Sequence, residues 1–208
     1  MIAEGRVGEH KVAGGVTEDA RLGSYAELIA NDVGFGRYFE AVRNGRLYHL
    51  ASAGVTVATA GAVTNPVLAL LMPASGTKAA VVIEAIWTPK TVGTFAAYTA
   101  ALYGAAGLNG TAVSNVTPVN ALLGGGASSG KGFAAVASTF TSAPPLLRPL
   151  AFSLLVTPAG QNIGWREEVA GSIIVPPGAG VAISASASQT AGTADVALVY
   201  VEIDWPLP

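Results

Sequence analysis

Residues 165–183 have the sequence WREEVAGSIIVPPGAGVAI, in which a Pro-Pro-Gly corner separates two short apolar runs, Ser172–Val175 and Val181–Ile183. Proline ends a strand ladder because it has no N–H to donate, and glycine adopts the positive φ angles that tight turns need. The stretch therefore predicts two β segments joined by a stiff turn.

The same pattern continues along the chain from Leu47 onward, where short apolar or alternating runs are separated by clusters of Gly, Pro, Asn and Ser. Residues 95–103 fit a helical face as well as an alternating strand, and their neighbours favour a strand. About eight to ten strands at this spacing predict an all-β fold, an antiparallel β-sandwich of the jelly-roll kind. The other runs that we expect to form strands are Leu47–Ala51, Val55–Thr59, Val67–Met72, Ala79–Trp87, Phe133–Phe140, Leu150–Thr157, Val181–Ala187 and Val196–Trp205.

The charged residues are concentrated near the N-terminus. Both histidines and 13 of the charged residues lie in the first 50 positions, although the whole chain has only 11 Lys+Arg and 13 Asp+Glu. Residues 1–23 are Gly-rich and charged and have no apolar periodicity, which is typical of an arm that depends on a partner. We therefore expect residues 1–44 to form an N-terminal arm and residues 45–208 to form the β-sandwich body.

One short helix is predicted within this arm, near residues 24–33. Ser24 and Glu27 have the spacing of a capping box, in which each side chain hydrogen-bonds an N–H group at the start of the helix. Gly34 is placed to end the helix, because glycine adopts the left-handed conformation that closes a last turn.

The composition of the body excludes several classes of function. After residue 50 only six acids and five bases remain, which leaves little for acid/base or metal chemistry and favours assembly over catalysis. The net charge of −2 does not indicate the basic surface that binds nucleic acid. The absence of cysteine excludes thiolate metal sites. The apolar runs are shorter than the roughly 18 residues of a membrane span. We expect no catalytic residues, no cofactor, no metal, and neither a nucleic-acid nor a membrane partner.

The best match to a nucleotide-binding motif is Gly125-x-x-x-x-Gly130-Lys131. It follows the P-loop pattern up to the last position, where Gly132 replaces the Ser or Thr that coordinates Mg²⁺. A P-loop also lies between a buried strand and a helix, whereas a strand-like run follows here. We therefore interpret residues 121–132 as a glycine-rich surface hairpin.

Two carboxylate pairs are candidate sites. Glu167 and Glu168 are adjacent, so on a strand they point to opposite faces and form no paired acid/base site. Glu202 and Asp204 would share a face and could hold Ca²⁺, but two carboxylates are few for the six to eight oxygens that Ca²⁺ takes. An exposed or salt-bridged sheet edge is the expected role of this second pair.

The histidines and the aromatic residues have simpler explanations. His10 and His49 lack a second His or Cys at the spacing of metal ligands, so each is expected to be solvated or at an interface. The aromatic residues could form a sugar-stacking set, but each lies in or beside a strand-like run, so core or subunit-interface packing is expected. They are Trp87, Trp165, Trp205, Tyr98, Tyr103 and Tyr200.

The string GSIIVPPG at residues 171–178 resembles an element of small Gly/Ala-rich virion proteins that are encoded beside the capsid genes of tailed bacteriophages. The likeness extends to GRLYHLASAG at residues 45–54, to PVLALLMPASGTKAAVVIEAIW at residues 66–87 and to the glycine-rich loop, and it spans residues 45–205. The resemblance implies a jelly-roll capsid decoration or minor structural subunit, and it brings no catalytic residues. The long charged arm at residues 1–44 departs from the family.

The sequence therefore predicts a non-enzymatic bacteriophage virion structural protein, a capsid decoration or minor head protein. The expected partners are the chain itself, as a symmetric homo-oligomer and most simply a trimer, and the major capsid or other virion proteins. The arm would dock on the shell or on a neighbouring subunit, and the protein would be located in the virion after assembly in the host cytoplasm. The alternative is the receptor- or carbohydrate-binding head of a phage fibre or spike.

Overall fold

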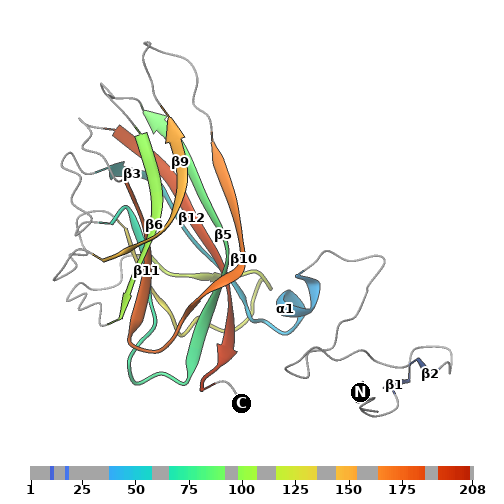
Figure 1. Cartoon of the computed structure of the whole chain (residues 1–208). Coiled ribbons are helices and arrows are strands. Elements are labelled where there is room, and N and C mark those ends of the chain that lie inside the picture. Colours follow the sequence, from blue (N-terminus) through green and yellow to red (C-terminus); the bar gives the residue numbers. More distant parts are fainter. Residues whose placement is uncertain are drawn as a thin grey trace, which may run out of the picture. The chain divides into compact units, whose positions relative to one another are not determined.

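The computed structural model in Figure 1 describes residues 10–11, 17–18, 38–57, 66–91, 98–106, 116–134, 144–153, 164–185 and 192–206. The chain divides into two units, Met1–Phe39 with Pro208, and Glu40–Leu207. In the first unit, β1 (His10–Lys11) and β2 (Thr17–Glu18) pair antiparallel. The helix predicted near residues 24–33 lies outside the described residues.

A short helix, α1 (Phe39–Arg43), precedes the first strand of the body. Its last turn closes through hydrogen bonds from Gly45 N to Val42 O (2.8 Å) and from Arg46 N to Ala41 O (2.8 Å). Gly45 has a φ of 64°, the left-handed conformation that ends a helix and that favours glycine. The division between the two units falls at the start of this helix, between Phe39 and Glu40.

The second unit is a sandwich of two five-stranded antiparallel sheets, which confirms the predicted all-β fold. The β12 sheet has the order β10-β5-β12-β3-β7, and the β11 sheet has the order β8-β4-β11-β6-β9. The strands are β3 (Leu47–Val57), β4 (Leu68–Leu71), β5 (Lys78–Thr91), β6 (Tyr98–Ala106), β7 (Val119–Asn120), β8 (Lys131–Ala134), β9 (Leu146–Ser153), β10 (Trp165–Val175), β11 (Ala179–Ala185) and β12 (Gly192–Asp204).

The strand pairs are nested from the ends of the body inward, as in a jelly roll. β3 pairs with β12, β4 with β11, β5 with β10 and β6 with β9, and each pair is antiparallel. Successive pairs alternate between the sheets, and the β12–β5 and β11–β6 pairings then join them. This is the eight-stranded double-sheet arrangement of a jelly roll. β7 and β8 come from the segment between β6 and β9, and they extend the sheets beside β3 and β4.

The Pro-Pro-Gly corner joins β10 to β11 and carries the chain from one sheet to the other. Gly178 has a φ of 79°, and its N–H donates to Met72 O (2.9 Å), while Ala179 N donates to Pro176 O (3.0 Å). The prolines end β10 and the positive φ of Gly178 reverses the chain, as the sequence predicts.

Alternating side chains of both sheets fill the space between them. On β12 the inward residues are Val196, Leu198 and Tyr200, and they pack in one cluster with residues of the opposite sheet such as Leu70 and Ile183. Each large apolar side chain that is fully buried stabilises the fold by about 1.5–3 kcal/mol relative to an exposed position. A smaller cluster of Ala69, Phe133 and Ala182, with Leu71 packed against it, belongs to the β11 sheet.

Candidate functional site

Residues 121–130 connect β7 to β8, and we call them the glycine-rich crossover. The predicted hairpin is wrong, because β7 pairs with β3 in one sheet whereas β8 pairs with β4 in the other. The crossover therefore spans the two sheets. A strand begins at Lys131, the last residue of the P-loop-like motif, where a P-loop would lead into a helix.

Glu202 on β12 anchors the end of the crossover. Its side chain shares the inward face with Tyr200 and is only 6% exposed. One carboxylate oxygen, Oε1, accepts hydrogen bonds from Ser128 Oγ (2.6 Å), Ser129 N (2.8 Å) and Gly130 N (3.4 Å). Such charge-assisted hydrogen bonds offset the free energy lost when a carboxylate leaves water.

The expectation of an exposed or salt-bridged edge therefore holds for only one member of the Glu202–Asp204 pair. Glu202 is buried on a strand that lies between β5 and β3, so the prediction of an exposed edge is wrong for it. Asp204 is exposed and pairs with Lys78, and the hydrogen bond from this lysine lowers the pKa of the Asp204 carboxyl.

Two stacked tyrosines line the inner side of the crossover. The rings of Tyr48 and Tyr200 are 5.7 Å apart, the two hydroxyl oxygens of Ser128 and Tyr200 are 2.6 Å apart, and the Tyr48 hydroxyl donates to Ala127 O (3.4 Å). Burial, and then the nearby charge of Glu202, raise the pKa of Tyr200 far above its usual value, although the hydrogen bond with Ser128 acts in the opposite direction. Burial also raises the pKa of Tyr48. Both hydroxyls therefore stay protonated at neutral pH.

Asn120 shapes the start of the crossover. Its Nδ2 donates to Gly45 O (2.9 Å) and to Gly126 O (3.0 Å), and its Oδ1 accepts from Leu122 N (2.9 Å). Gly125 N then donates to Leu122 O (2.7 Å). A φ of 86° at the intervening Gly124 is the value that a type II turn has at its third residue. Leu123 is therefore the second residue of a turn that is fixed from inside the protein.

This arrangement presents apolar side chains to solvent. Leu123 is 88% exposed, Val119 is 57% exposed and Leu122 is 42% exposed. We call these three residues the apolar turn. Burying such side chains against a protein partner is favourable by about 25 cal/mol per Å² of apolar area.

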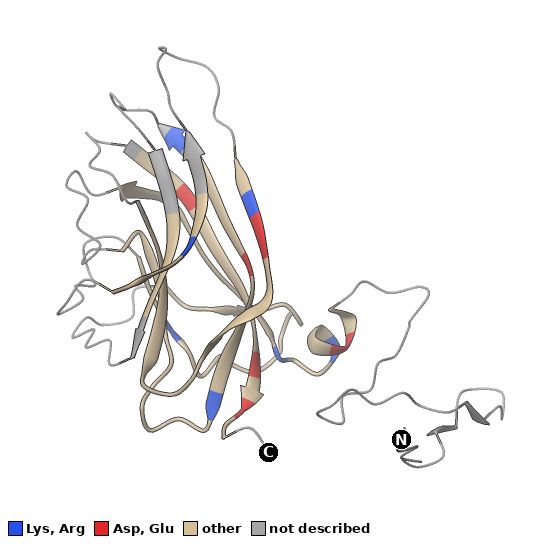
Figure 2. Cartoon of the chain, viewed as in Figure 1, with Lys and Arg blue, Asp and Glu red and all other residues tan. Residues whose placement is uncertain are grey.

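Figure 2 shows only a few short blue and red bands on the otherwise tan strands of the body, and most of these charged residues lie in ion pairs. Four of the five bases after residue 50 have a carboxylate partner. Arg148 Nη2 on β9 lies 2.6 Å from Glu167 Oε1 on β10, which links the edge strands of opposite sheets. The pairs are Lys78–Asp204, Lys90–Asp195, Arg148–Glu167 and Arg166–Glu84.

The remaining predicted residues lie apart from the crossover. Glu167 is half-buried and Glu168 is exposed, which confirms that the two carboxylates point to opposite faces of β10. His49 is exposed on β3 and His10 lies in β1. Within the described ranges, His, Asp and Glu side chains form no group of three that could hold a metal ion. Among those same ranges no helix is long and apolar enough to cross a membrane.

The core prediction is confirmed for four of the six aromatic residues, whereas Trp205 is only half-buried and belongs to neither core cluster, and the side chain of Tyr98 lies outside the described residues. Trp87 and Tyr200 are fully buried, Tyr103 is buried, and Trp165 packs against the main core cluster. Comparisons with protein-family models, with curated proteins and with solved structures found no match.

Sequence reasoning missed the residues that build the apolar turn, namely Asn120, Ser128 and Leu123. A two-residue strand such as β7 is too short to give a periodic pattern, and the contact of Ser128 with Glu202 joins positions far apart in the sequence. The signal that was present is the pair Leu122–Leu123 directly before three glycines, because large apolar residues seldom stand in a glycine-rich turn without a packing role.

Proposed function

We propose that this protein is a non-enzymatic structural component of a bacteriophage virion, a capsid decoration or minor head protein. It assembles as a symmetric homo-oligomer, with three copies as the simplest number, and docks on the major capsid protein or another virion protein. The jelly-roll fold and the resemblance of residues 45–205 to phage virion proteins support this proposal.

The observation that carries the proposal is the apolar turn. Leu123 is 88% exposed, yet its loop is held by Asn120 and Glu202. A loop whose backbone is already held in one conformation loses less conformational entropy when a partner covers it. Exposed apolar groups on a rigid support are typical of protein contact sites.

The paired charges favour the same function. An unpaired charge that is covered by a neighbouring protein is strongly unfavourable, whereas a charge with its own partner is less so. Arg148–Glu167 and Arg166–Glu84 are satisfied within the chain, so these parts of the surface are suited to close packing with other subunits.

The apolar turn can be tested in assembled particles. We expect Leu123→Ser to reduce the occupancy of the chain in purified virions by about tenfold or more, the loss that corresponds to burial of one leucine. The matched control is Leu146→Ser, since Leu146 is 56% exposed on β9 of the β11 sheet and lies outside the apolar turn. Equal occupancy for both variants and the unchanged protein would refute a docking role for the turn.

The arm is tested separately by deleting residues 1–23. If the arm docks on the shell or on a neighbour, occupancy falls while the oligomer of the body remains. Occupancy equal to that of the full chain would remove the arm from the docking model.

A receptor- or carbohydrate-binding head of a phage fibre or spike is the second candidate. Its sugar-stacking aromatic residues would have to be accessible, but Trp87, Tyr103 and Tyr200 are buried. The structural role is therefore preferred. Binding of the isolated chain to a glycan array would reverse this preference.

A further inference from the structure

The β12 sheet has a second face that points away from the core. Because Val196, Leu198 and Tyr200 of β12 belong to the core cluster, the alternate residues of this strand point outward. Residues that are directly opposite each other on neighbouring strands point to the same side. We call the face of β10, β5, β12 and β3 that these alternate residues form the outer sheet face. Along its centre Ala197, Val199, Val201 and Ile203 follow one another on β12.

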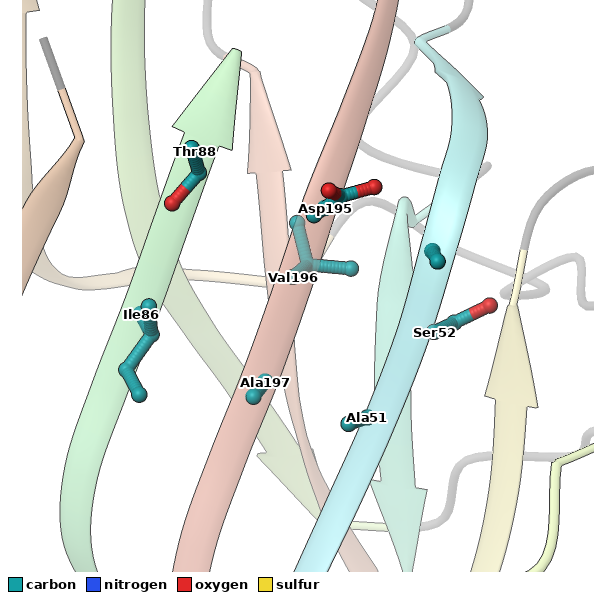
Figure 3. A pocket seen from close by; sticks show the side chains of 8 residues that line it. Ala51, Ser52, Ile86, Thr88, Asp195, Val196 and Ala197 are labelled. Atoms are coloured by element: carbon teal, nitrogen blue, oxygen red, sulfur yellow. The ribbon is translucent and has the colours of Figure 1, made fainter. Parts of the chain in front are cut away.

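One row across this face has large side chains on one half and small side chains on the other. Arg166 on β10 is opposite Ile86 on β5, which is opposite Ala197 on β12, which is opposite Ala51 on β3. Figure 3 shows Ile86, Ala197 and Ala51 side by side on their three strands. The small residues on β12 and β3 leave a depression of about 330 Å³, which Ile86 and Thr88 border on the β5 side and which Asp195 also lines.

A second row across the face ends in a carboxylate on one side and in an imidazole on the other. Glu168 on β10 is opposite Glu84 on β5, then comes Val199 on β12, and His49 on β3 completes the row. Glu168 and His49 are both exposed, so a carboxylate borders one side of the face and an imidazole borders the other. Near one end of the same face, Lys90 on β5 pairs with Asp195 on β12 at 3.8 Å.

The two rows are self-complementary under a two-fold rotation, which places the large side chains of one copy over the small side chains of the other. We propose that two copies of the chain pack with their outer sheet faces together, about a two-fold axis that runs along the strands between β5 and β12. Each β10 then lies over the partner's β3, and each β5 lies over the partner's β12. Arg166 and Ile86 of one copy enter the depression over the partner's Ala51 and the partner's Ala197. A two-fold contact of this kind uses the same patch on both subunits.

The same two-fold rotation also places acidic side chains of one copy opposite basic side chains of the other. Glu168 faces the partner's His49, and Lys90 faces the partner's Asp195, and each contact occurs twice. An imidazole can donate a hydrogen bond to a carboxylate whether it is neutral or protonated. Complementary charges at the border of an interface fix its register and suppress other arrangements.

The area of the face is sufficient for a specific dimer. Four strands about 4.8 Å apart, each about 12 residues long, cover roughly 750 Å² per copy. A standard stable interface buries about 800 Å² per partner. This inference rests on the proposed homo-oligomer and deepens it, since it identifies one contact surface. A three-fold assembly would then pair with a second one through this face to give a hexamer, and a chain without three-fold contacts would form a dimer, so the number of copies is even.

The test is sedimentation equilibrium and native mass spectrometry of the full chain. We expect even-numbered species, and we expect Ala197→Phe, which fills the depression, to raise the dissociation constant by at least about tenfold. Leu146→Ser is the matched control, because it removes a side chain that is 56% exposed on β9 of the other sheet, and it should leave the dissociation constant unchanged. Unaltered circular dichroism of each variant shows that the sheet still forms.

Charge exchange provides a second test at exposed positions. His49→Glu places two carboxylates together and should weaken the dimer, whereas the double variant with Glu168→Lys should restore it to within about threefold of the original. A monomer at about 100 µM, a trimer without even-numbered species, or an Ala197→Phe chain that associates normally would overturn the inference.

Failure of this inference and failure of the proposed function give different results. A trimer that still occupies virions would overturn only the face-to-face contact. A dimer that forms through this face but is absent from virions would overturn only the virion role.

Discussion

The carboxylate of Glu202 lies beneath residues 128–130, where it accepts hydrogen bonds from one hydroxyl and two backbone N–H groups. We expect Glu202→Gln to destabilise the protein by about 1.5–3 kcal/mol, the range for hydrogen bonds to a charged group, because the amide has the same size but no charge. Urea unfolding measures the loss, and faster amide hydrogen exchange at Ser129 and Gly130 would locate it. Glu40→Gln in α1 is the control, because its carboxylate pairs only at the surface with Arg43 (3.5 Å), and it should change stability by less than about 0.5 kcal/mol.

The hydroxyl of Tyr200 makes the free energy of unfolding depend on pH in the alkaline range. Burial raises the pKa of the folded-state hydroxyl above the ordinary value of 10.0, so the unfolded chain loses this proton first as the pH rises. The unfolded state then binds fewer protons than the native state, and the free energy of unfolding falls above about pH 10. Urea midpoints between about pH 8 and 11.5 test this, and Tyr200→Phe should flatten the decline. A midpoint that stays constant over this range in the unchanged protein would contradict the assignment.

At the scale of the elements, two glycines of the glycine-rich segment differ in how much space surrounds them. A Cβ at Gly132 would lie 2.2 Å from Leu50 Cδ1 and 2.5 Å from the backbone oxygen of Val116, whereas a Cβ at Gly126 would meet nothing within 4 Å. We expect Gly132→Ala to destabilise the protein by about 1–3 kcal/mol through overpacking. Gly126→Ala should be neutral or stabilising by up to about 1 kcal/mol, because it only restricts the unfolded chain. Equal thermal midpoints for the two variants would contradict the close packing of Gly132 against Leu50 and Val116.

Periodic elements were predictable from the sequence, and contacts between distant elements were not. Every strand from β3 to β12 except β7 overlaps a predicted run, because each contains a short run of continuous or alternating apolar residues. Leu47–Ala51 and Val55–Thr59 were separated by a glycine, but Gly54 sits at a bulge within the single strand β3, where its N–H donates to Asp195 Oδ1 (2.6 Å). A bulge interrupts the alternation without ending the strand.

The glycine-rich crossover shows why the site itself was not predictable. Glycine content favours a turn, but a hairpin and a passage between two sheets have the same local sequence. The difference depends on Glu202 and Asn120, whose partners are either distant in the sequence or backbone atoms. The burial of Glu202 could have been inferred from its inward register with Leu198 and Tyr200 two and four residues earlier.

At the scale of the whole molecule, the nested pairing places the two ends of the body in one sheet. β3 is the first strand of the body and β12 is the last, and they are neighbours in the β12 sheet. Because the outermost pair closes the longest loop, the native structure depends on contacts between positions about 150 residues apart, such as Leu47 and Val201. Domains dominated by such non-local pairings fold in milliseconds to seconds, more slowly than helical ones.

The same topology predicts which truncations are tolerated. Both described apolar clusters belong to the unit Glu40–Leu207. A chain that lacks residues 1–38 should therefore keep its β circular dichroism and unfold with a free energy within about 1 kcal/mol of the full protein. Removal of residues 192–208 is the opposing case. It takes away β12, which pairs with both β5 and β3 and carries Glu202, so this chain should not fold. A folded protein without β12, or an unfolded one without residues 1–38, would contradict the assignment of the core to the sandwich.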